Sequence, residues 1–187
     1  MEQYKVILVD DEVEVIDIMK QKIRWNDLGF DVVGSATNGV KALELVEKLQ
    51  PDVVLTDIKM PYMDGLELAR KLNQDYPNIY IMLCTGFDEF EYAKEAVHLE
   101  IKEYMLKPIS ATELSDSLVK LKNTLDKERE EKLKEIYEGL EEIKDQLTAL
   151  IDEYEEEETH TGKADELIEA LDALEDASET IEDVLED

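Results

Sequence analysis

The stretch VVLTDIKMPYMDGLEL, residues 53–68, contains an apolar run that stops at a carboxylate, Asp57. Val53–Leu55 lacks the polar alternation of a half-exposed strand, so it predicts a parallel strand that is buried on both faces. The following Asp64-Gly65 pair favours a turn, and a helical pattern begins after it. Asp57 is therefore predicted at the carboxyl end of a strand, which is the edge of an open α/β sheet at which ligands bind.

Short apolar runs of this kind recur along the first 126 residues, separated by segments with helical spacing of apolar residues. The predicted strands are Val6–Val9, Phe30–Val33, Val53–Leu55, Ile79–Cys84 and Tyr104–Leu106. Five strands that alternate with five helices predict a doubly wound α/β domain with a parallel sheet and right-handed crossovers. The fourth of these helices is expected at about Glu89 to Leu99.

Polar side chains follow four of the predicted strands: Asp10, Asp11, Asp57, Thr85 and Lys107. Three carboxylates at one edge repel one another unless a cation lies among them, and a small cluster of hard oxygen ligands suits Mg²⁺. Lys107 and the Thr85 hydroxyl would then bind the oxygens of a phosphoryl group, with Asp57 as the candidate nucleophile. Each residue alone is explained by a helix cap or a turn. Their occurrence at successive strand ends favours a phosphoryl-transfer site.

Four motifs occur in order within residues 1–126: VDD at 9–11, TDIKMPYMDG at 56–65, Thr85-Gly86 and YMLKP at 104–108. In order and spacing they resemble the receiver domain of two-component response regulators. IRWNDLGFDVVGSATNG and GFDEFEYAKEAV are similar to the subgroup whose receivers usually precede AraC-type helix-turn-helix domains. The resemblance implies a flavodoxin-like five-stranded sheet in the order 2-1-3-4-5.

The resemblance also implies how the carboxylates are used. Asp57 would accept a phosphoryl group from a sensor histidine kinase and bind Mg²⁺. Asp11 would bind the ion directly and Asp10 through water, while Lys59 would contribute its backbone carbonyl.

The remaining site residues would bind the phosphoryl group and report its presence. Lys107 and the Thr85 hydroxyl would contact the phosphoryl oxygens. Tyr104 matches the switch aromatic, whose ring turns inward when Thr85 moves toward the phosphate. The Lys107–Pro108 bond is expected to be cis, because an X-Pro amide tolerates that form. A receiver would be no enzyme beyond self-catalysed phosphoryl transfer and autodephosphorylation.

A Mg²⁺-dependent phosphatase that uses Asp57 as nucleophile is the alternative from the enzyme class. Position 59 is Lys, whereas haloacid-dehalogenase-like phosphatases place a second Asp there as general acid. The sequence therefore favours the receiver.

Charge and composition limit the partners and the compartment. The net charge is -29, and residues 127–187 carry 6 Lys/Arg against 25 Asp/Glu. Such an acidic segment repels phosphate backbones, so direct binding of nucleic acid is not expected; imitation of DNA by the acidic segment is the minor alternative. The sequence has one cysteine, Cys84, and no apolar run long enough for a membrane span. A cytoplasmic protein with no membrane partner is expected.

Residues 127–187 form a second predicted domain, an acidic antiparallel hairpin of helices at about 127–157 and 163–186, which is expected to continue from the last receiver helix. The first helix has a predicted heptad seam: Leu133, Ile136, Leu140, Ile143, Leu147, Leu150 and Tyr154. Because two helices bury one stripe each, a homodimer that forms a four-helix bundle is the first expectation. Docking on the receiver is the second, and a solvated spacer is the third. A receiver that only carries a structural or binding hairpin, in a natural or engineered fusion, is the alternative function.

Overall fold

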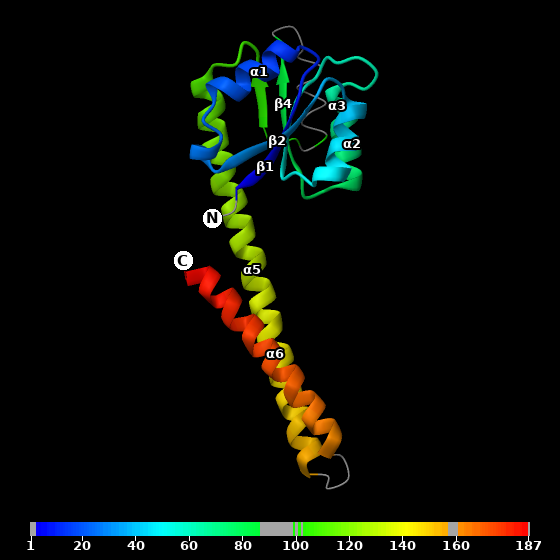
Figure 1. Ribbon diagram of the computed structural model, residues 1–187, viewed down its shortest axis with the longest axis vertical. Coiled ribbons are helices and arrows are strands. Elements are labelled where there is room, and N and C mark those ends of the chain that lie inside the picture. The colour runs from blue at the N-terminus through cyan, green and yellow to red at the C-terminus, as the bar shows by residue number, and fades with distance from the viewer. Residues whose placement is uncertain (1–2, 87–98, 100, 102, 157–160, 187) are drawn as a thin grey trace. The chain divides into compact units, whose positions relative to one another are not determined.

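The computed structural model describes residues 3–86, 99, 101, 103–156 and 161–186 (Figure 1). The chain divides into two compact units, Met1–Lys122 and Asn123–Asp187. Among the described residues, no helix is both long enough and apolar enough to cross a membrane.

The first unit is built on a parallel five-stranded sheet in the order β2-β1-β3-β4-β5. The strands are β1 (Tyr4–Val9), β2 (Phe30–Ala36), β3 (Val53–Asp57), β4 (Tyr80–Thr85) and β5 (Glu103–Leu106). Every residue of β3 and β4 is buried, as their continuous apolar runs predict. The predicted fold class and strand order are confirmed.

Helices cover both faces of this sheet. They are α1 (Val13–Lys22), α2 (Gly39–Leu49), α3 (Gly65–Asp75) and the first turns of α5 (Ala111–Glu156), with a short 3-10 helix, η1 (Asn26–Leu28). Figure 1 shows α2 and α3 on one face and α1 with the start of α5 on the other. The helix predicted at about Glu89 to Leu99 falls almost entirely outside the described residues.

Side-chain caps fix where two of these helices begin. Asn38 accepts a hydrogen bond from the Lys41 backbone N–H and so caps α2. Asp64 and Glu67 form a reciprocal capping box at the start of α3, so the helix predicted after Asp64-Gly65 begins at Gly65 itself. Because α3 begins there, the segment after Asp57 is a short loop with a fixed end.

The core lies on both sides of the sheet. On one side Ile7 and Val54 pack with Leu68 and Leu72 of α3. On the other, Ile16 of α1 and Leu114 and Leu118 of α5 are buried. With both faces covered, the carboxyl edge of the strands is where polar side chains gather.

The second unit is a helical hairpin. The 46-residue helix α5 begins in the first unit and continues without a break to Glu156, and α6 (Thr161–Glu186) lies alongside it (Figure 1). Ser178 Oγ donates to Glu141 Oε1 at 2.6 Å, and Lys163 Nζ lies 5.9 Å from the ring centroid of Tyr154. Late residues of α6 therefore meet earlier residues of α5, so the two helices are antiparallel.

The predicted heptad seam is wrong at three of its seven positions, which are exposed. Ile136, Ile143 and Leu150 are 53%, 50% and 38% exposed. The buried and half-buried positions of this part of α5 include Leu133, Tyr137, Leu140, Lys144, Leu147 and Ile151. One neighbouring helix covers only a narrow stripe, and a straight helix of 3.6 residues per turn drifts away from a 3.5-residue repeat.

Candidate functional site

The ends of two strands bring the three predicted carboxylates together. Asp10 and Asp11 follow β1, and Asp57 is the last residue of β3. One oxygen from each of these three side chains lies within 4.8 Å of the other two. Asp10 and Asp57 are buried, while Asp11 is exposed, so the cluster opens to solvent on one side.

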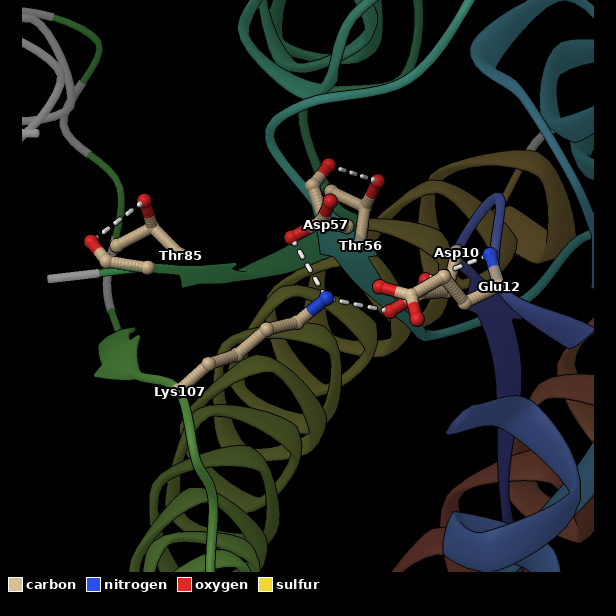
Figure 2. A network of polar contacts seen from close by, with 7 residues as sticks. Asp10, Glu12, Thr56, Asp57, Thr85 and Lys107 are labelled. Atoms are coloured by element: carbon tan, nitrogen blue, oxygen red, sulfur yellow. Dashed lines mark hydrogen bonds and ion pairs between the residues drawn. The ribbon is translucent and has the colours of Figure 1, made fainter. Parts of the chain in front are cut away.

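Lys107, which follows β5, completes the cluster. Figure 2 shows its ammonium group between the carboxylates of Asp10 and Asp57, at 2.8 Å from Asp10 Oδ2 and 2.9 Å from Asp57 Oδ1. The sequence predicted contact of Lys107 with a phosphoryl group. The sequence did not predict that Lys107 pairs with two carboxylates. In the structure its positive charge lies between Asp10 and Asp57.

Burial and charge act in opposite directions on Asp57. Burial raises the pKa of Asp57 above its usual value, and the nearby Asp10 charge adds to this rise. The hydrogen bond and charge of Lys107, together with the Ile58 backbone N–H, lower that pKa but do not outweigh burial. Ionised Asp57 is thus a desolvated carboxylate, a costly state that a second cation would relieve.

The same pairing affects Lys107 and the neighbouring Cys84. Burial lowers the pKa of Lys107, but hydrogen bonds to Asp10 and Asp57 and the charges of both carboxylates outweigh burial and raise it. Cys84 lies beside Asp57 in the sheet register, and burial raises the pKa of its thiol to about 12. Lys107 therefore remains charged at neutral pH, and Cys84 remains a neutral core thiol.

Backbone contacts hold the carboxylates in place. The Glu12 N–H donates to Asp10 Oδ1 at 3.0 Å, and Thr56 Oγ1 donates to the Asp57 carbonyl at 2.9 Å (Figure 2). Gly65 N–H donates to the Ile58 carbonyl at 2.8 Å, and a Cβ at Gly65 would lie 2.1 Å from the Asp57 carbonyl oxygen. From the sequence, Gly65 was predicted only to be a turn residue. The Asp64-Gly65 pair was the one signal in the sequence that could have indicated this close approach to Asp57.

Thr85, Tyr104 and Lys59 surround this centre. Thr85 ends β4; its carbonyl accepts a hydrogen bond from the Lys107 backbone N–H at 2.6 Å, and its hydroxyl donates to the Gly86 carbonyl at 3.5 Å. Tyr104 lies on β5, half-buried against the core. Lys59 follows Asp57 by two residues, with an exposed side chain. The Lys107–Pro108 bond is cis, as expected. The roles assigned to these residues stay predictions.

The donor set fits Mg²⁺. The ion takes oxygen ligands at about 2.0–2.1 Å in octahedral geometry, so ligand oxygens lie about 3 to 4 Å apart, and it commonly uses one or two carboxylates. Oxygens within 4.8 Å of one another need only small side-chain rotations to reach that spacing. Asp11 and Asp57, with Asp10 beside them, are the residues that would hold the ion.

The comparison with protein families identifies this arrangement. A family model described as the response regulator receiver domain matches residues 6–119. The chain belongs to the response regulator receiver family. Receiver domains of two-component systems bind Mg²⁺ at an acidic site, and this chain contains an acidic cluster of Asp10, Asp11 and Asp57.

Individual receivers resemble the first unit. "Uncharacterized transcriptional regulatory protein YesN" of Bacillus subtilis is 44% identical over 115 residues, which cover 62% of this chain and 31% of that protein. "Transcriptional regulatory protein HptR" of Staphylococcus aureus is 35% identical over 122 residues, covering 65% and 48%. The chain thus spans less than half the length of these curated relatives.

Solved receiver structures agree in fold. The receiver domain of AraT, a response regulator from Geobacillus stearothermophilus, has 37% sequence identity and a TM-score of 0.65, covering 67% of this chain and 98% of that chain. A two-component transcriptional regulator AraC from Clostridium phytofermentans has 32% identity and a TM-score of 0.63, covering 68% and 98%. In both cases the likeness covers about two thirds of this chain.

Proposed function

We propose that the chain is a phosphorylation-dependent signalling switch that accepts a phosphoryl group on Asp57 from a sensor histidine kinase in the cytoplasm. The observation that carries the proposal is the position of Asp57 at a strand end, 2.9 Å from Lys107 and within one cluster with Asp10 and Asp11. In this arrangement Asp57 would act as the nucleophile, and Lys107 and a bound Mg²⁺ would supply positive charge beside it.

In the transfer step, an Asp57 carboxylate oxygen attacks the phosphorus atom. The new O–P bond forms while the P–N bond to the kinase histidine breaks, and the histidine nitrogen keeps the electron pair of that bond. Asp11 and Asp57 would hold Mg²⁺, which when bound would neutralise charge on the transferred oxygens. Lys107 would exchange its contact with Asp57 for one with the phosphoryl group and keep its contact with Asp10.

The readout follows from the added charge. Phosphorylation adds about -1.5 to -2 charges at one strand end. Lys107 and the Thr85 hydroxyl would move toward this charge, and the Tyr104 ring would turn inward as Thr85 leaves its position. The surface of β5 and α5 would change with them.

The helical hairpin supplies the output, by self-association or by binding another protein. Its acidic character argues against direct binding of nucleic acid by this chain. Transcriptional regulation, the role in the names of the relatives, belongs to proteins of which this chain matches less than half. A receiver that merely carries the hairpin is the alternative.

Incubation of the full chain with a small acyl phosphate and Mg²⁺ tests the input. We expect intact-mass spectrometry to detect one added phosphoryl group. This group should not be added when Mg²⁺ is chelated before the phosphodonor is supplied, nor in Asp57→Asn. Asp17→Asn, which changes an exposed carboxylate on α1, should leave labelling unchanged. Undiminished labelling of Asp57→Asn would refute Asp57 as the acceptor.

Light scattering tests the output. If self-association is the output, the chain changes from monomer to dimer when the phosphodonor and Mg²⁺ are added. If the molar mass is the same with and without phosphoryl labelling, binding of another protein remains as the output. If labelling also leaves the affinity of the hairpin for that protein unchanged, the carrier alternative is favoured.

A further inference from the structure

The helical hairpin has one apolar face. On α5 the exposed side chains of Ile136, Ile143 and Leu150 recur every seven residues, so they lie along one side of the helix. On α6 the side chains at Ala173 and Val184 are exposed and eleven residues apart, three helical turns. Each helix therefore has an uncovered apolar side.

Contacts between the helices show that these two sides belong to the same face. Residues two apart in a helix point about 200° apart, close to opposite directions. Glu141 of α5, which accepts a hydrogen bond from Ser178, is two residues from Ile143. Glu175 of α6, whose charge helps to raise the pKa of Lys144, is two residues from Ala173. Because Glu141 pairs with Lys144 at 2.8 Å and the charge of Glu175 also acts on Lys144, these two glutamates mark one face of the hairpin, so Ile143 and Ala173 lie on the opposite one.

We call this opposite face the apolar face; its side chains are Ile136, Ile143 and Leu150 of α5 and Ala170, Ala173 and Val184 of α6. The side chains of this face are large on α5, and two of the three on α6 are alanines, so a third helix can pack on it by ridges and grooves. This is the helix-in-groove mode of recognition, in which the ligand helix supplies anchors at helical spacing.

The charges along the apolar face select the partner. Glu135 and Glu142 each precede an exposed isoleucine of α5, and Glu166 and Glu169 lie near the alanines of α6. The face has Arg129 and Lys132 at its beginning, but after Lys144 the sequence contains a single basic residue, Lys163. A second copy would bring two strongly acidic surfaces together, which is unfavourable. A cationic helix is instead attracted to these four glutamates, which we call the rim of the apolar face.

We infer that the apolar face of the hairpin binds a basic amphipathic helix of another protein. Apolar anchors of that helix contact Ile136, Ile143 and Leu150, and its Lys or Arg side chains contact the glutamates of the rim. The inference rests on the proposed output role of the hairpin and is independent of phosphorylation at Asp57.

A synthetic peptide tests the inference on the full chain. The probe is a fluorescent helix with Leu at heptad spacing and Lys at the flanking positions, and binding is measured by fluorescence anisotropy. Two control peptides have the same composition in scrambled order, or Glu in place of Lys. We expect saturable binding of one probe per chain, at least tenfold tighter than that of either control and weakened by added salt.

Variants on the two faces locate the binding site. Ile136→Ser combined with Ile143→Ser should weaken probe binding at least tenfold. Ile168→Ser should change it less than twofold, because Ile168 is also 37% exposed but lies seven residues before Glu175, on the opposite face. Circular dichroism verifies that both variants remain helical, and Ile143→Ala replaces the double variant if that variant loses helicity.

Three results would overturn the inference: equal binding of the scrambled or acidic peptide, equal loss in the Ile168 variant, or no saturable binding. Light scattering of the free chain adds a fourth, because a dimer that the double variant dissociates would mean that a second copy fills the face. Phosphoryl labelling of the same preparation, measured separately, shows whether the site at Asp57 works regardless of the peptide result.

Discussion

At the scale of single residues, Asp57 shows how a receiver site opposes its own stability. Burial makes the ionised form of the Asp57 carboxylate costly, and Lys107 compensates for only part of that cost. Residues that serve a reactive group in this way are expected to reduce the free energy of unfolding.

Asp57→Asn is accordingly expected to raise the thermal unfolding midpoint at pH 7 in buffer with a metal chelator. The raised pKa of Asp57 means that its ionised form destabilises the fold above that pKa and that protonation removes the cost. The advantage of Asn should therefore shrink as the pH falls through the pKa of Asp57. Asp17→Asn serves as the surface control, and a lower midpoint for Asp57→Asn would show that its pairing with Lys107 dominates.

Gly65→Ala is expected to damage the site through the backbone. The added methyl group would meet the Asp57 carbonyl oxygen at 2.1 Å, so the loop after β3 has to move. We expect a loss of about 1–3 kcal/mol in the free energy of unfolding, as for overpacked cores, together with weaker phosphoryl labelling at Asp57. Urea unfolding and intact-mass spectrometry measure the two effects. Full labelling with wild-type stability would contradict the steric role of Gly65.

Sequence reasoning identified the types of residue in the site better than the contacts among them. Asp10, Asp11, Asp57 and Lys107 could be predicted together because each follows an apolar strand, and parallel strands end at one edge. The bridging of two carboxylates by Lys107 depends on side-chain conformations, which local sequence does not determine.

At the scale of elements, strands and helices differ in how well their exposed sides can be predicted. A strand buried on both faces has a continuous apolar run, so β3 and β4 followed directly from their sequences. In α5 every heptad position looks equally apolar. Only the position of α6 separates Ile151, which is buried, from Ile136 and Ile143, which are exposed.

Gly139→Ala tests the helix α5 by itself. Gly139 lies inside the helix, and beyond its chain neighbours and the nearby backbone of the helix itself a Cβ at this position would have no heavy atom within 4 Å. Because glycine loses more backbone entropy than alanine on folding, we expect a gain of about 0.5–1 kcal/mol in helix stability. Circular dichroism at increasing temperature measures it. A loss of helicity would mean that Gly139 serves a contact, in contrast to Gly65, where a loss is expected.

At the scale of the whole molecule, charge is distributed unequally between the two units. Ion pairs such as Lys127–Glu131 and Lys134–Glu130 link successive turns of α5, but exposed pairs contribute little. They cannot offset 25 acidic residues against 6 basic ones in residues 127–187. Self-repulsion should therefore reduce the stability of the hairpin more than that of the receiver.

Added NaCl is expected to raise the unfolding midpoint of the hairpin. At about 1 M salt the screening length falls to about 3 Å, so repulsion between carboxylates on successive turns is weakened. Far-UV circular dichroism follows the helices, while Trp25, the single tryptophan, is buried in the first unit and reports that unit by fluorescence. A larger stabilisation of the Trp25 signal than of the helical signal would argue against repulsion in the hairpin.

Because Cys84 is buried, the rate at which its thiol is alkylated measures how often the sheet opens. The chain has one thiol, which is fully buried beside Asp57, and its pKa is raised to about 12. An alkylating reagent reacts with the thiolate, so the folded protein is protected both by exclusion of the reagent and by lack of the reactive form. The rate of alkylation then depends on how frequently β3 and β4 separate by local unfolding. A ligand that binds the acidic cluster at the end of these strands should therefore lower the rate of alkylation of Cys84.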